Sequence, residues 1–512
     1  MSSSLPPRKD GVGSVPQEVA AEGAGLEPTL DGEAVAQAGR VLDYARRGKT
    51  WADRSPSVKL ILALAMPTLV DQMLSAGIGI TDTVVAGHTG ATEELRAAAA
   101  AAVGTMTYLQ WFAGLMTAAL GVGATAIIAR SIGAHRPRVA TRVAGTVCTA
   151  SFLVGLVVAA IFYVFAEQVV YGFGLREQAS VYGAQYLRIM SVTICFQTLG
   201  QIGMACLRGA GDTMRPMLVT AAITVVNGLA SPALAFGWFG LPAMGVRGNA
   251  IGTLLAFALA GLATVALLIS GSAGLRLRRR HFRLVPHVLV RVLRIGMPSW
   301  LEGMLLWGGQ ALIVVLVINP TDKARGVDGV TMAAHNAVLR VESLAFLPGF
   351  GFGMACSALV GQYLGAKKPG EARHAALLCR RLAVTTMTVA ALPMVFVPWV
   401  MLRLMVDSDA VVATGLWPLV LAGLAQPGFA IAIAMSSALR GAGETVAPMM
   451  STISGMVIRL VLVLSTAALF AHLGHAAWGL VAVWIAIFVD LNYRAVFTGI
   501  VFARGKWMEK IV

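Results

Sequence analysis

Charged residues are scarce in this chain of 512 residues. Asp, Glu, Lys and Arg together make up only 13% of the sequence, whereas hydrophobic residues make up 57%. Soluble domains carry about 25% charged residues, so this composition excludes an ordinary soluble fold. The mean hydropathy is +0.75, and apolar runs of about 20 residues, enough to cross a bilayer as a helix, recur along the chain. We therefore expect an all-α integral membrane protein.

Cysteine pairing, metal-ligand spacing and catalytic motifs are also missing. The five cysteines show no CxxC spacing and fall in or beside apolar runs, which predicts buried, reduced side chains. No nucleophile, metal-ligand set or paired acid and base rises above the background. We therefore expect no enzyme, no metal site and no cofactor.

Basic residues outnumber acidic ones, and the net charge is +15. They lie mainly in short connections between apolar runs, most densely at residues 276–283. This distribution is the positive-inside pattern of membrane proteins, whereas nucleic-acid recognition needs a folded polar surface that is missing here. The connections after even-numbered apolar runs hold most of the arginines and lysines. We expect these connections and both termini to be cytoplasmic, in a monomer of the inner (plasma) membrane.

One segment occurs twice. Residues 207–217, LRGAGDTMRPM, return as LRGAGETVAPM at 439–449. The other repeated pairs, at the same spacing or one residue closer, are 132–134 with 364–366 and 66–67 with 297–298. Three matches at nearly one spacing indicate two homologous halves.

The apolar runs predict twelve transmembrane helices, six in each half. Their approximate bounds are 58–86, 97–127, 140–166, 180–206, 214–236, 245–271, 291–318, 330–360, 373–403, 410–438, 447–471 and 476–502. Because six is even, both halves have the same orientation, so a pseudo-two-fold axis along the membrane normal relates two six-helix lobes. The expected divisions are a disordered cytoplasmic tail (1–50), an N-lobe (51–271), a cytoplasmic linker (272–290) and a C-lobe (291–512).

Short motifs along the chain are typical of one transporter family. They are Pro67 followed by Asp82-Thr83-Val84 in the first span, the doubled LRGAG segment, Ala334-His335-Asn336, and the tail Arg504-Gly505-Lys506-Trp507. These motifs resemble those of multidrug and toxic compound extrusion (MATE) transporters, and they are closer to the DinF-type branch. The resemblance covers about residues 55–508. It implies an antiporter that exports organic, often cationic and aromatic, compounds against a proton or sodium gradient.

The resemblance also implies an ion-coupling cluster in the N-lobe. In the DinF-type branch this cluster has an aspartate in helix 1, an Asn-x-x-x-Asp pair in helix 5 and a threonine in helix 6. Asp82, Asn227 and Thr253 match these positions, whereas Ser231 replaces the helix 5 aspartate. The NorM-type carboxylates of helices 7 and 10 are disfavoured, since the predicted helix 10 holds no acid. Without the second aspartate, the choice between proton and sodium stays open.

Acidic side chains inside apolar runs need a partner or a function, because an ionisable group in hydrocarbon costs about 2.5–3.5 kcal/mol or more. Asp71 and Asp82 stand three helical turns apart, so both point the same way. They fit a proton path with two stations, and we assign both to coupling. Alternatively, Asp71 only hydrogen-bonds its neighbours. Glu302 is the repeat partner of Asp71, so these two acids could face one central cavity and hold a cationic substrate.

The same reasoning gives a candidate substrate cavity. We assign to it Glu302, Glu342, Trp300 and Met73. Acids and aromatic faces attract organic cations, and methionine adapts to varied shapes. Packing or lipid contact is the alternative for the apolar side chains, and structural pairing is the alternative for Glu342. Arg459 and Asp490 are expected to neutralise one another.

The sequence therefore predicts a secondary active antiporter that exports organic, cationic and aromatic compounds in exchange for protons by alternating access. A sodium-coupled exporter and a lipid-linked saccharide flippase of the same superfamily are the alternatives. The expected partners are a small organic substrate and membrane lipid, with no nucleic acid. The membrane-embedded charges near the presumed cleft are mainly acidic, which favours a cationic cargo over the pyrophosphate of a flippase substrate.

Overall fold

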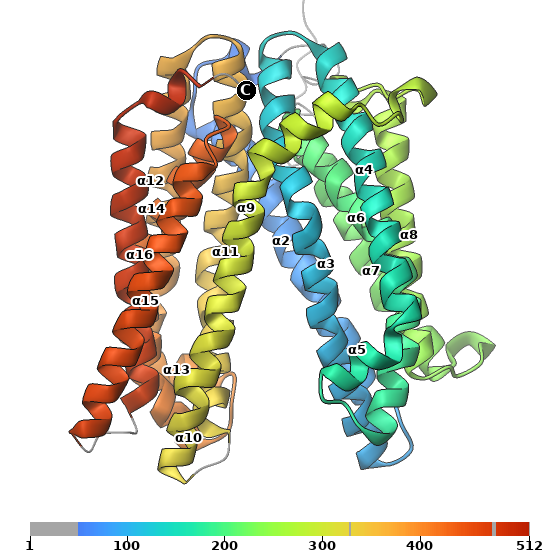
Figure 1. Ribbon diagram of the computed structural model, residues 1–512, viewed down its shortest axis with the longest axis vertical. Helices are drawn as coiled ribbons and strands as arrows, with labels where there is room; N and C mark the ends of the chain where they lie inside the picture. Colours follow the sequence, from blue (N-terminus) through green and yellow to red (C-terminus); the bar gives the residue numbers. More distant parts are fainter. Residues whose placement is uncertain (1–49, 327–328, 474–477, 511–512) are drawn as a thin grey trace, which may run out of the picture.

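A computed structural model describes residues 50–326, 329–473 and 478–510. Over these residues the regular structure is entirely helical, and twelve long helices form two lobes of six, as predicted (Figure 1). The predicted tail lies outside the described residues, except for Thr50. The domain boundaries within the chain stay predictions.

The long helices follow the twelve apolar runs. In the N-lobe they are α2 (Val58–Gly87), α3 (Glu93–Gly133), α4 (Pro137–Val164), α6 (Glu177–Gly209), α7 (Met214–Phe236) and α8 (Val246–Ser270). In the C-lobe they are α9 (Pro286–Ile313), α11 (Val330–Gly365), α12 (Pro369–Phe396), α14 (Asp409–Gly441), α15 (Val446–His472) and α16 (Gly479–Ala503). The short helices are α5 (Ala166–Gly172), α10 (Asn319–Arg325), α13 (Pro398–Arg403) and the 3-10 turns η1 (Trp51–Asp53), η2 (Trp238–Gly240), η3 (Ser272–Gly274), η4 (Arg279–His281) and η7 (Lys506–Met508).

Two predicted spans are less regular than expected. The seventh begins earlier, at Pro286, and continues through a π-helical turn, η5 (Val314–Ile318), into α10. The ninth breaks between α12 and α13, where Pro398 starts a new helix. A proline lacks the N–H that would continue the first helix and fits the first turn of the second.

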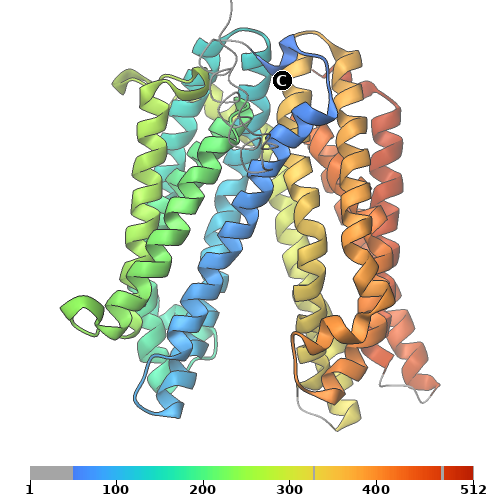
Figure 2. The same ribbon diagram turned by 180° about the vertical axis from the view of Figure 1, so that it is seen from behind.

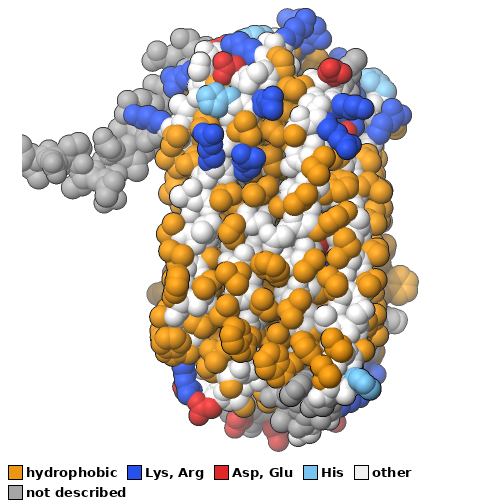
Figure 3. Space-filling view, turned by 90° about the vertical axis from the view of Figure 1, so that its left-hand side faces the viewer, with side chains coloured by type: hydrophobic (Ala, Val, Ile, Leu, Met, Phe, Trp, Pro, Cys, Tyr) orange, Lys and Arg blue, Asp and Glu red, His pale blue; other side chains and the backbone are white. Residues whose placement is uncertain are grey.

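The surface of the bundle is that of a multi-pass membrane protein. Within the described residues, eleven helices are long and apolar enough to cross a membrane, and α3 contributes the shorter apolar stretch Thr117–Gly133. Seen from the side of α12 and α16, hydrophobic side chains form a broad belt (Figure 3). Lysine and arginine side chains gather at the end where α3, α6, α11 and α14 finish, which we call the basic end.

The two lobes are joined at the basic end and diverge toward the opposite end (Figure 1 and Figure 2). The first helix of each lobe packs into the core of the other lobe. Ile61 of α2 joins a core that contains Leu359 of α11, and Val292 of α9 joins a core that contains Ile127 of α3. Ile61 and Val292 occupy equivalent positions in the two repeats, so this exchange obeys the predicted pseudo-two-fold axis.

Two glycines allow α3 and α11 to cross at this junction. A Cβ atom at Gly133 would overlap the carbonyl oxygen of Gln362, and one at Gly365 would overlap the carbonyl oxygen of Arg130. The two contacts are copies of each other, because the two glycines occupy equivalent positions in the repeats. The repeated Ile/Leu-Gly-Ala segment is therefore a close helix crossing between the lobes.

The segment before α2 forms a strap across the basic end. The Trp51 indole N–H donates to the carbonyl oxygen of Gly211 in the N-lobe at 2.9 Å, and the Trp51 backbone N–H donates to Oε1 of Gln362 in the C-lobe at 3.1 Å. Tyr363 and Lys368 of the C-lobe donate to backbone carbonyls of the same segment, both at 2.8 Å. The strap is therefore hydrogen-bonded to both lobes.

The glycine crossing predicts that Gly133→Leu destabilises the protein. The added side chain meets backbone rather than a flexible side chain, so we expect a loss of about 1–3 kcal/mol. Thermal unfolding of the purified protein in detergent measures this loss. Gly499→Ala is the control, because a Cβ atom there meets nothing within 4 Å. Equal unfolding temperatures for Gly133→Leu and wild type would contradict the close crossing.

Candidate ion-coupling site and buried ion pairs

Asp82 lies in the second half of α2 with a carboxylate that is almost fully buried. Thr253 Oγ1 and Asn227 Nδ2 donate to Oδ1 of Asp82 at 2.9 and 3.0 Å. Asn227 comes from α7 and Thr253 from α8, so three helices meet at one oxygen atom. The structure brings together the three residues that the family resemblance grouped.

Three further residues surround this cluster. Ser231, one turn after Asn227, accepts a hydrogen bond from Asn227 Nδ2 at 3.1 Å and donates to the carbonyl oxygen of Asn249 at 3.2 Å. Asn249 Nδ2 donates to the backbone oxygen of Asp82 at 3.0 Å, and Tyr186 Oη donates to Oδ2 of Asp82 at 3.5 Å. Within the described residues no basic side chain pairs with Asp82. Its charge has amide and hydroxyl donors but no fixed countercharge.

Asp71, three turns earlier in α2, has a different environment. Arg208, in the last turn of α6, donates to Oδ2 of Asp71 at 2.6 Å. Thr220 of α7 donates to Oδ1. The Asp71 side chain is 2% exposed and the Arg208 side chain 18%. Asp71 is thus held in an ion pair, and the contacts of the two carboxylates involve different partners.

The C-lobe repeats this arrangement at Glu302 of α9. Arg440, in the last turn of α14, donates to both carboxylate oxygens at 2.8 Å. Thr452 of α15 donates to Oε1 at 2.9 Å. This arginine and this threonine are the repeat counterparts of the two residues that contact Asp71, just as Glu302 is the counterpart of Asp71 itself. The pseudo-two-fold axis therefore relates two carboxylate–arginine–threonine clusters.

These ion pairs change the interpretation of both acids. From the sequence, Asp71 and Glu302 have no assigned basic partner, and Arg208 and Arg440 fall beside the connections between apolar runs. A long arginine side chain at a helix end can lie along its neighbours in the bundle, and a count of charges per connection does not reveal its direction. The repeated LRGAG segment was the sequence feature that could have indicated these two ion pairs. Because both acids have a fixed countercharge, neither offers a free negative charge to a cation in this structure.

A second ion-pair network joins α15 and α16. Arg459 Nη2 donates to Oδ2 of Asp490 at 2.5 Å, which confirms the predicted pairing of these two residues. Arg494, which the sequence analysis missed, adds a second arginine to Asp490 at 2.6 Å. Its Nη1 also donates to Thr452 at 3.3 Å. Through Thr452, this network is continuous with the cluster around Glu302.

Glu342 stands apart from these pairs. It is buried in the middle of α11 and accepts a long hydrogen bond, 3.4 Å, from Nε2 of Gln426 in α14. Arg459 attracts it from a distance, but within the described residues the two form no ion pair. Like Asp82, Glu342 carries no fixed countercharge in direct contact.

The apolar residues assigned to the substrate cavity lie on the first helix of each lobe. Met73 of α2 is 55% exposed, and Trp300 of α9 is half-buried. These exposures leave both side chains accessible, and their roles stay predictions.

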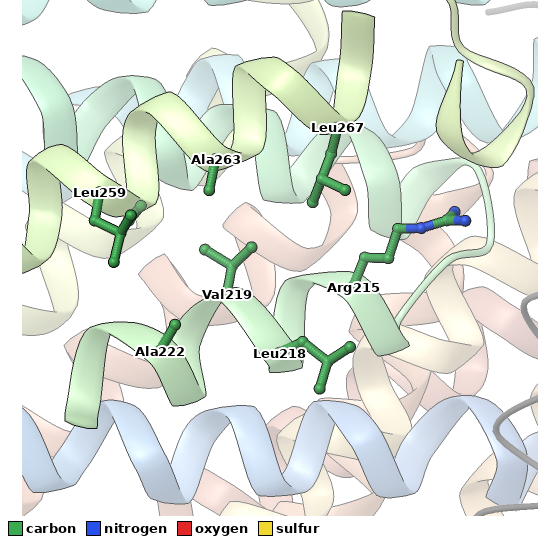
Figure 4. Close-up of a pocket in the computed structure, with 8 residues that line it drawn as sticks. Arg215, Leu218, Val219, Ala222, Leu259, Ala263 and Leu267 are labelled. Carbon is green, nitrogen blue, oxygen red and sulfur yellow. The ribbon is translucent and has the colours of Figure 1, made fainter. Parts of the chain in front are cut away.

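A hollow between α7 and α8 lies outside this candidate cavity (Figure 4). Its lining is apolar apart from Arg215, which pairs with Asp212 at 2.5 Å. Two of its lining residues, Leu218 and Leu259, are exposed on the surface of the bundle. Since none of its lining residues is acidic, the hollow is not part of the candidate ion-coupling site.

The comparisons with known proteins agree with this architecture. The MatE family model matches residues 67–233 and again residues 298–464, one match in each lobe. The two matches cover more than half of the chain, so the chain belongs to the MATE family. The MATE family consists of membrane transporters, so this protein is a transporter and not an enzyme.

The chain is similar over most of its length to proteins named for multidrug resistance. The probable multidrug resistance protein NorM of Thermotoga maritima is 27% identical over 89% of this chain and 94% of the relative. The multidrug resistance protein NorM of Burkholderia vietnamiensis is 27% identical over 77% of this chain and 83% of the relative.

Solved structures show the same fold. One is an outward-facing multidrug resistance MATE family transporter of the MOP superfamily, with a TM-score of 0.76 and 22% identity, over 88% of this chain and 97% of that chain. Another is the Vibrio cholerae MATE transporter VcmN in its bent form, with a TM-score of 0.77 and 16% identity, over 92% and 99% of the two chains.

The Glu302–Arg440 pair predicts strongly non-additive effects on stability. Arg440→Met leaves a buried carboxylate without its countercharge, and Glu302→Gln leaves a partly buried arginine without its partner. Each single substitution is therefore expected to cost about 3 kcal/mol. The double variant removes both charges and should cost clearly less than the sum. Unfolding of the purified protein in detergent measures all three.

A surface pair provides the control. Arg188 and Glu167 pair at 2.8 Å with side chains that are 45% and 60% exposed, so their coupling should stay below about 1 kcal/mol. Asp71→Asn and Arg208→Met give the matched cycle in the N-lobe. Additive losses in both lobes would show that the carboxylates and arginines do not stabilise each other.

Proposed function

We propose that this protein is a secondary active exporter that exchanges organic compounds for protons by alternating access. The basic end is its cytoplasmic end, in accordance with the positive-inside rule, and the plasma membrane is its location. Asp82 takes up the coupling proton. The names of the multidrug resistance relatives support export of organic compounds.

The environment of Asp82 carries this proposal. Five acids are buried in the long helices of the described residues, and three of them pair with arginines: Asp71, Glu302 and Asp490. Asp82 has only neutral hydrogen-bond donors. A carboxylate without a fixed countercharge in an apolar bundle is stabilised by a mobile cation. A transporter can use such a cation as its coupling ion.

The shape of α2 allows the coupling ion to affect the lobe. Pro67 lies inside the helix and removes one backbone hydrogen bond. Gly79 has no atom within 4 Å of an added Cβ, and Gly77 only an ordinary contact with Thr224. Close packing therefore does not require these two glycines, which favours a hinge over a packing role. Protonation of Asp82 would release its donors and permit α2 to bend.

The paired arginines bear on the class of substrate. Arg208 and Arg440 each bind a carboxylate, so neither gives the free positive charge that a pyrophosphate would need. This disfavours a flippase. The same pairs also remove two of the acids that favoured a cationic cargo, and that preference now depends on Asp82 and Glu342. We keep cationic, aromatic compounds as the proposed class, with Met73 and Trp300 lining their path.

Sodium is the second candidate for the coupling ion, and one observation favours it. The side-chain oxygens of Asn227 and Asn249 are buried and accept no hydrogen bond. Together with Asp82, Ser231 and Thr253 they provide oxygen atoms, the ligands that hard cations prefer. A protonated Asp82 would instead donate its proton to such an oxygen.

Transport of ethidium into everted membrane vesicles tests the proposal. Acid-loaded vesicles are diluted into alkaline, sodium-free medium, and a parallel set receives a sodium gradient at constant pH. We expect wild type to accumulate dye with the pH gradient alone. Asp82→Asn should lower this rate about tenfold or more, because the amide cannot take up a proton.

Two variants make the result specific. Glu167→Gln removes an exposed acid and should transport like wild type, whereas Glu342→Gln tests the other unpaired buried acid. Wild-type transport by Asp82→Asn would refute the role of Asp82. Transport driven only by sodium would replace the proton by sodium. No dye transport under either gradient would count against export of organic cations.

A further inference from the structure

A basic hollow lies where α4 of the N-lobe meets α9 of the C-lobe. It is lined by Arg138, Arg142, His287 and Arg291, and by Ile127, Val139, Val143 and Val288. We call it the arginine hollow. The polar residues stand in the first two turns of α4 and α9, so the hollow lies at the basic end of the bundle. Apolar side chains alternate with the basic ones along both helices.

The α4 arginines of this hollow are not neutralised by the described residues around them. None of the lining residues is acidic, and within the described residues neither Arg138 nor Arg142 forms an ion pair. Arg291 also repels Arg130. Burial and the charges of neighbouring arginines, Arg142 among them, lower the pKa of His281 in the adjoining η4 turn. An anion in the hollow would relieve this repulsion.

The repeat shows that this charge is specific to one place. The corresponding C-lobe positions are Gly370 for Arg138 and His374 for Arg142, and the corresponding position in α2 is Leu60 for Arg291. Leu60 is buried there in a core with Trp51 of the strap and Ala375 of α12. The α2–α12 junction is therefore filled by apolar side chains. The α4–α9 junction also has an apolar core, with Val143 and Val292, but exposed arginines stand beside that core.

We propose that the arginine hollow binds the head group of an anionic phospholipid. The guanidinium group of an arginine can donate two parallel hydrogen bonds to two oxygens of one phosphate. Basic pockets between transmembrane helices at the cytoplasmic face bind anionic lipid head groups. Val139 is 45% exposed beside the arginines and provides an apolar surface for the upper acyl chain. A free phosphate would leave this surface unused. The proposal rests on the proposed orientation, which places the basic end in the cytoplasmic leaflet.

A lipid in this position would join the two lobes. Arg138 and Arg142 belong to the N-lobe, and Arg291 belongs to the C-lobe. With one phosphate between them, their charges hold α4 and α9 together. The bound lipid would therefore favour the state in which the basic end is closed.

Native mass spectrometry of the purified protein with added phosphatidylglycerol or phosphatidylcholine tests this site. We expect wild type to retain phosphatidylglycerol about tenfold more tightly than phosphatidylcholine. The double variant Arg138→Gln/Arg142→Gln should lose that preference, as expected from the loss of two arginines at an anionic surface. The readout needs no transport, so it does not depend on the outcome of the ethidium experiment.

The repeat offers a matched control. Arg373→Gln/Arg381→Gln removes two exposed arginines from α12, the C-lobe counterpart of α4, and should keep the preference for phosphatidylglycerol. An equal loss in both double variants would show a general charge effect and overturn the site. Absence of any preference in wild type would also overturn it. Competition by inorganic phosphate at millimolar concentration would indicate an anion site rather than a lipid site. Unfolding temperatures in phosphatidylcholine verify that both variants are folded.

Discussion

The pairing of buried carboxylates with arginines is the constraint that orders this structure. An acid in an apolar helix bundle needs a partner, and in each lobe the doubled LRGAG segment supplies it. Its arginine stands in the last turn of α6 or α14 and reaches the first helix of the lobe. Its second glycine then takes a positive φ, 90° at Gly211 and 82° at Gly443. The following acid, Asp212 or Glu444, accepts backbone N–H bonds at the start of the next helix. This short segment thus ends one helix and starts the next, and its arginine neutralises a carboxylate on a third helix.

The lobes share this pair but differ around it, and the difference supports the proposal that ion coupling takes place in the N-lobe. The C-lobe counterpart of Asn227 is Arg459, and the counterpart of Ser231 is Val463. Arg459 brings a permanent positive charge and pairs with Asp490. The N-lobe has instead a carboxylate surrounded by neutral donors. Ion pairs between fixed charges stabilise one structure, whereas an acid without a countercharge can respond to the ions on either side of the membrane. The two lobes thus share the carboxylate–arginine pair, whereas the positions of Asn227 and Ser231 differ between them.

The fold could be predicted from the sequence because it depends on two features that a sequence displays directly, the apolar runs and the internal repeat. Twelve apolar runs became twelve long helices, and the spacing between repeated segments indicated the relation of the lobes. The grouping of Asp82, Asn227 and Thr253 followed from the family resemblance, not from spacing. What could not be predicted was the direction of long side chains. Arg208 and Arg440 stand where an arginine could point to water or into the bundle, and only packing decides. Asn249 and Tyr186 were missed because neutral polar residues in apolar spans give no comparable signal.

The contacts that join the two lobes at the basic end are of two kinds. The glycine crossings at Gly133 and Gly365 are copies of each other, so they treat the lobes alike. The two lateral junctions are not copies. The core of the α2–α12 junction includes Trp51 of the strap, whereas the core of the α4–α9 junction is flanked by the arginine hollow. A carrier that alternates between two states needs them close in free energy. If the arginine hollow binds an anionic lipid as proposed, that lipid would add a contact to one junction alone and would shift this balance toward the state in which the basic end is closed.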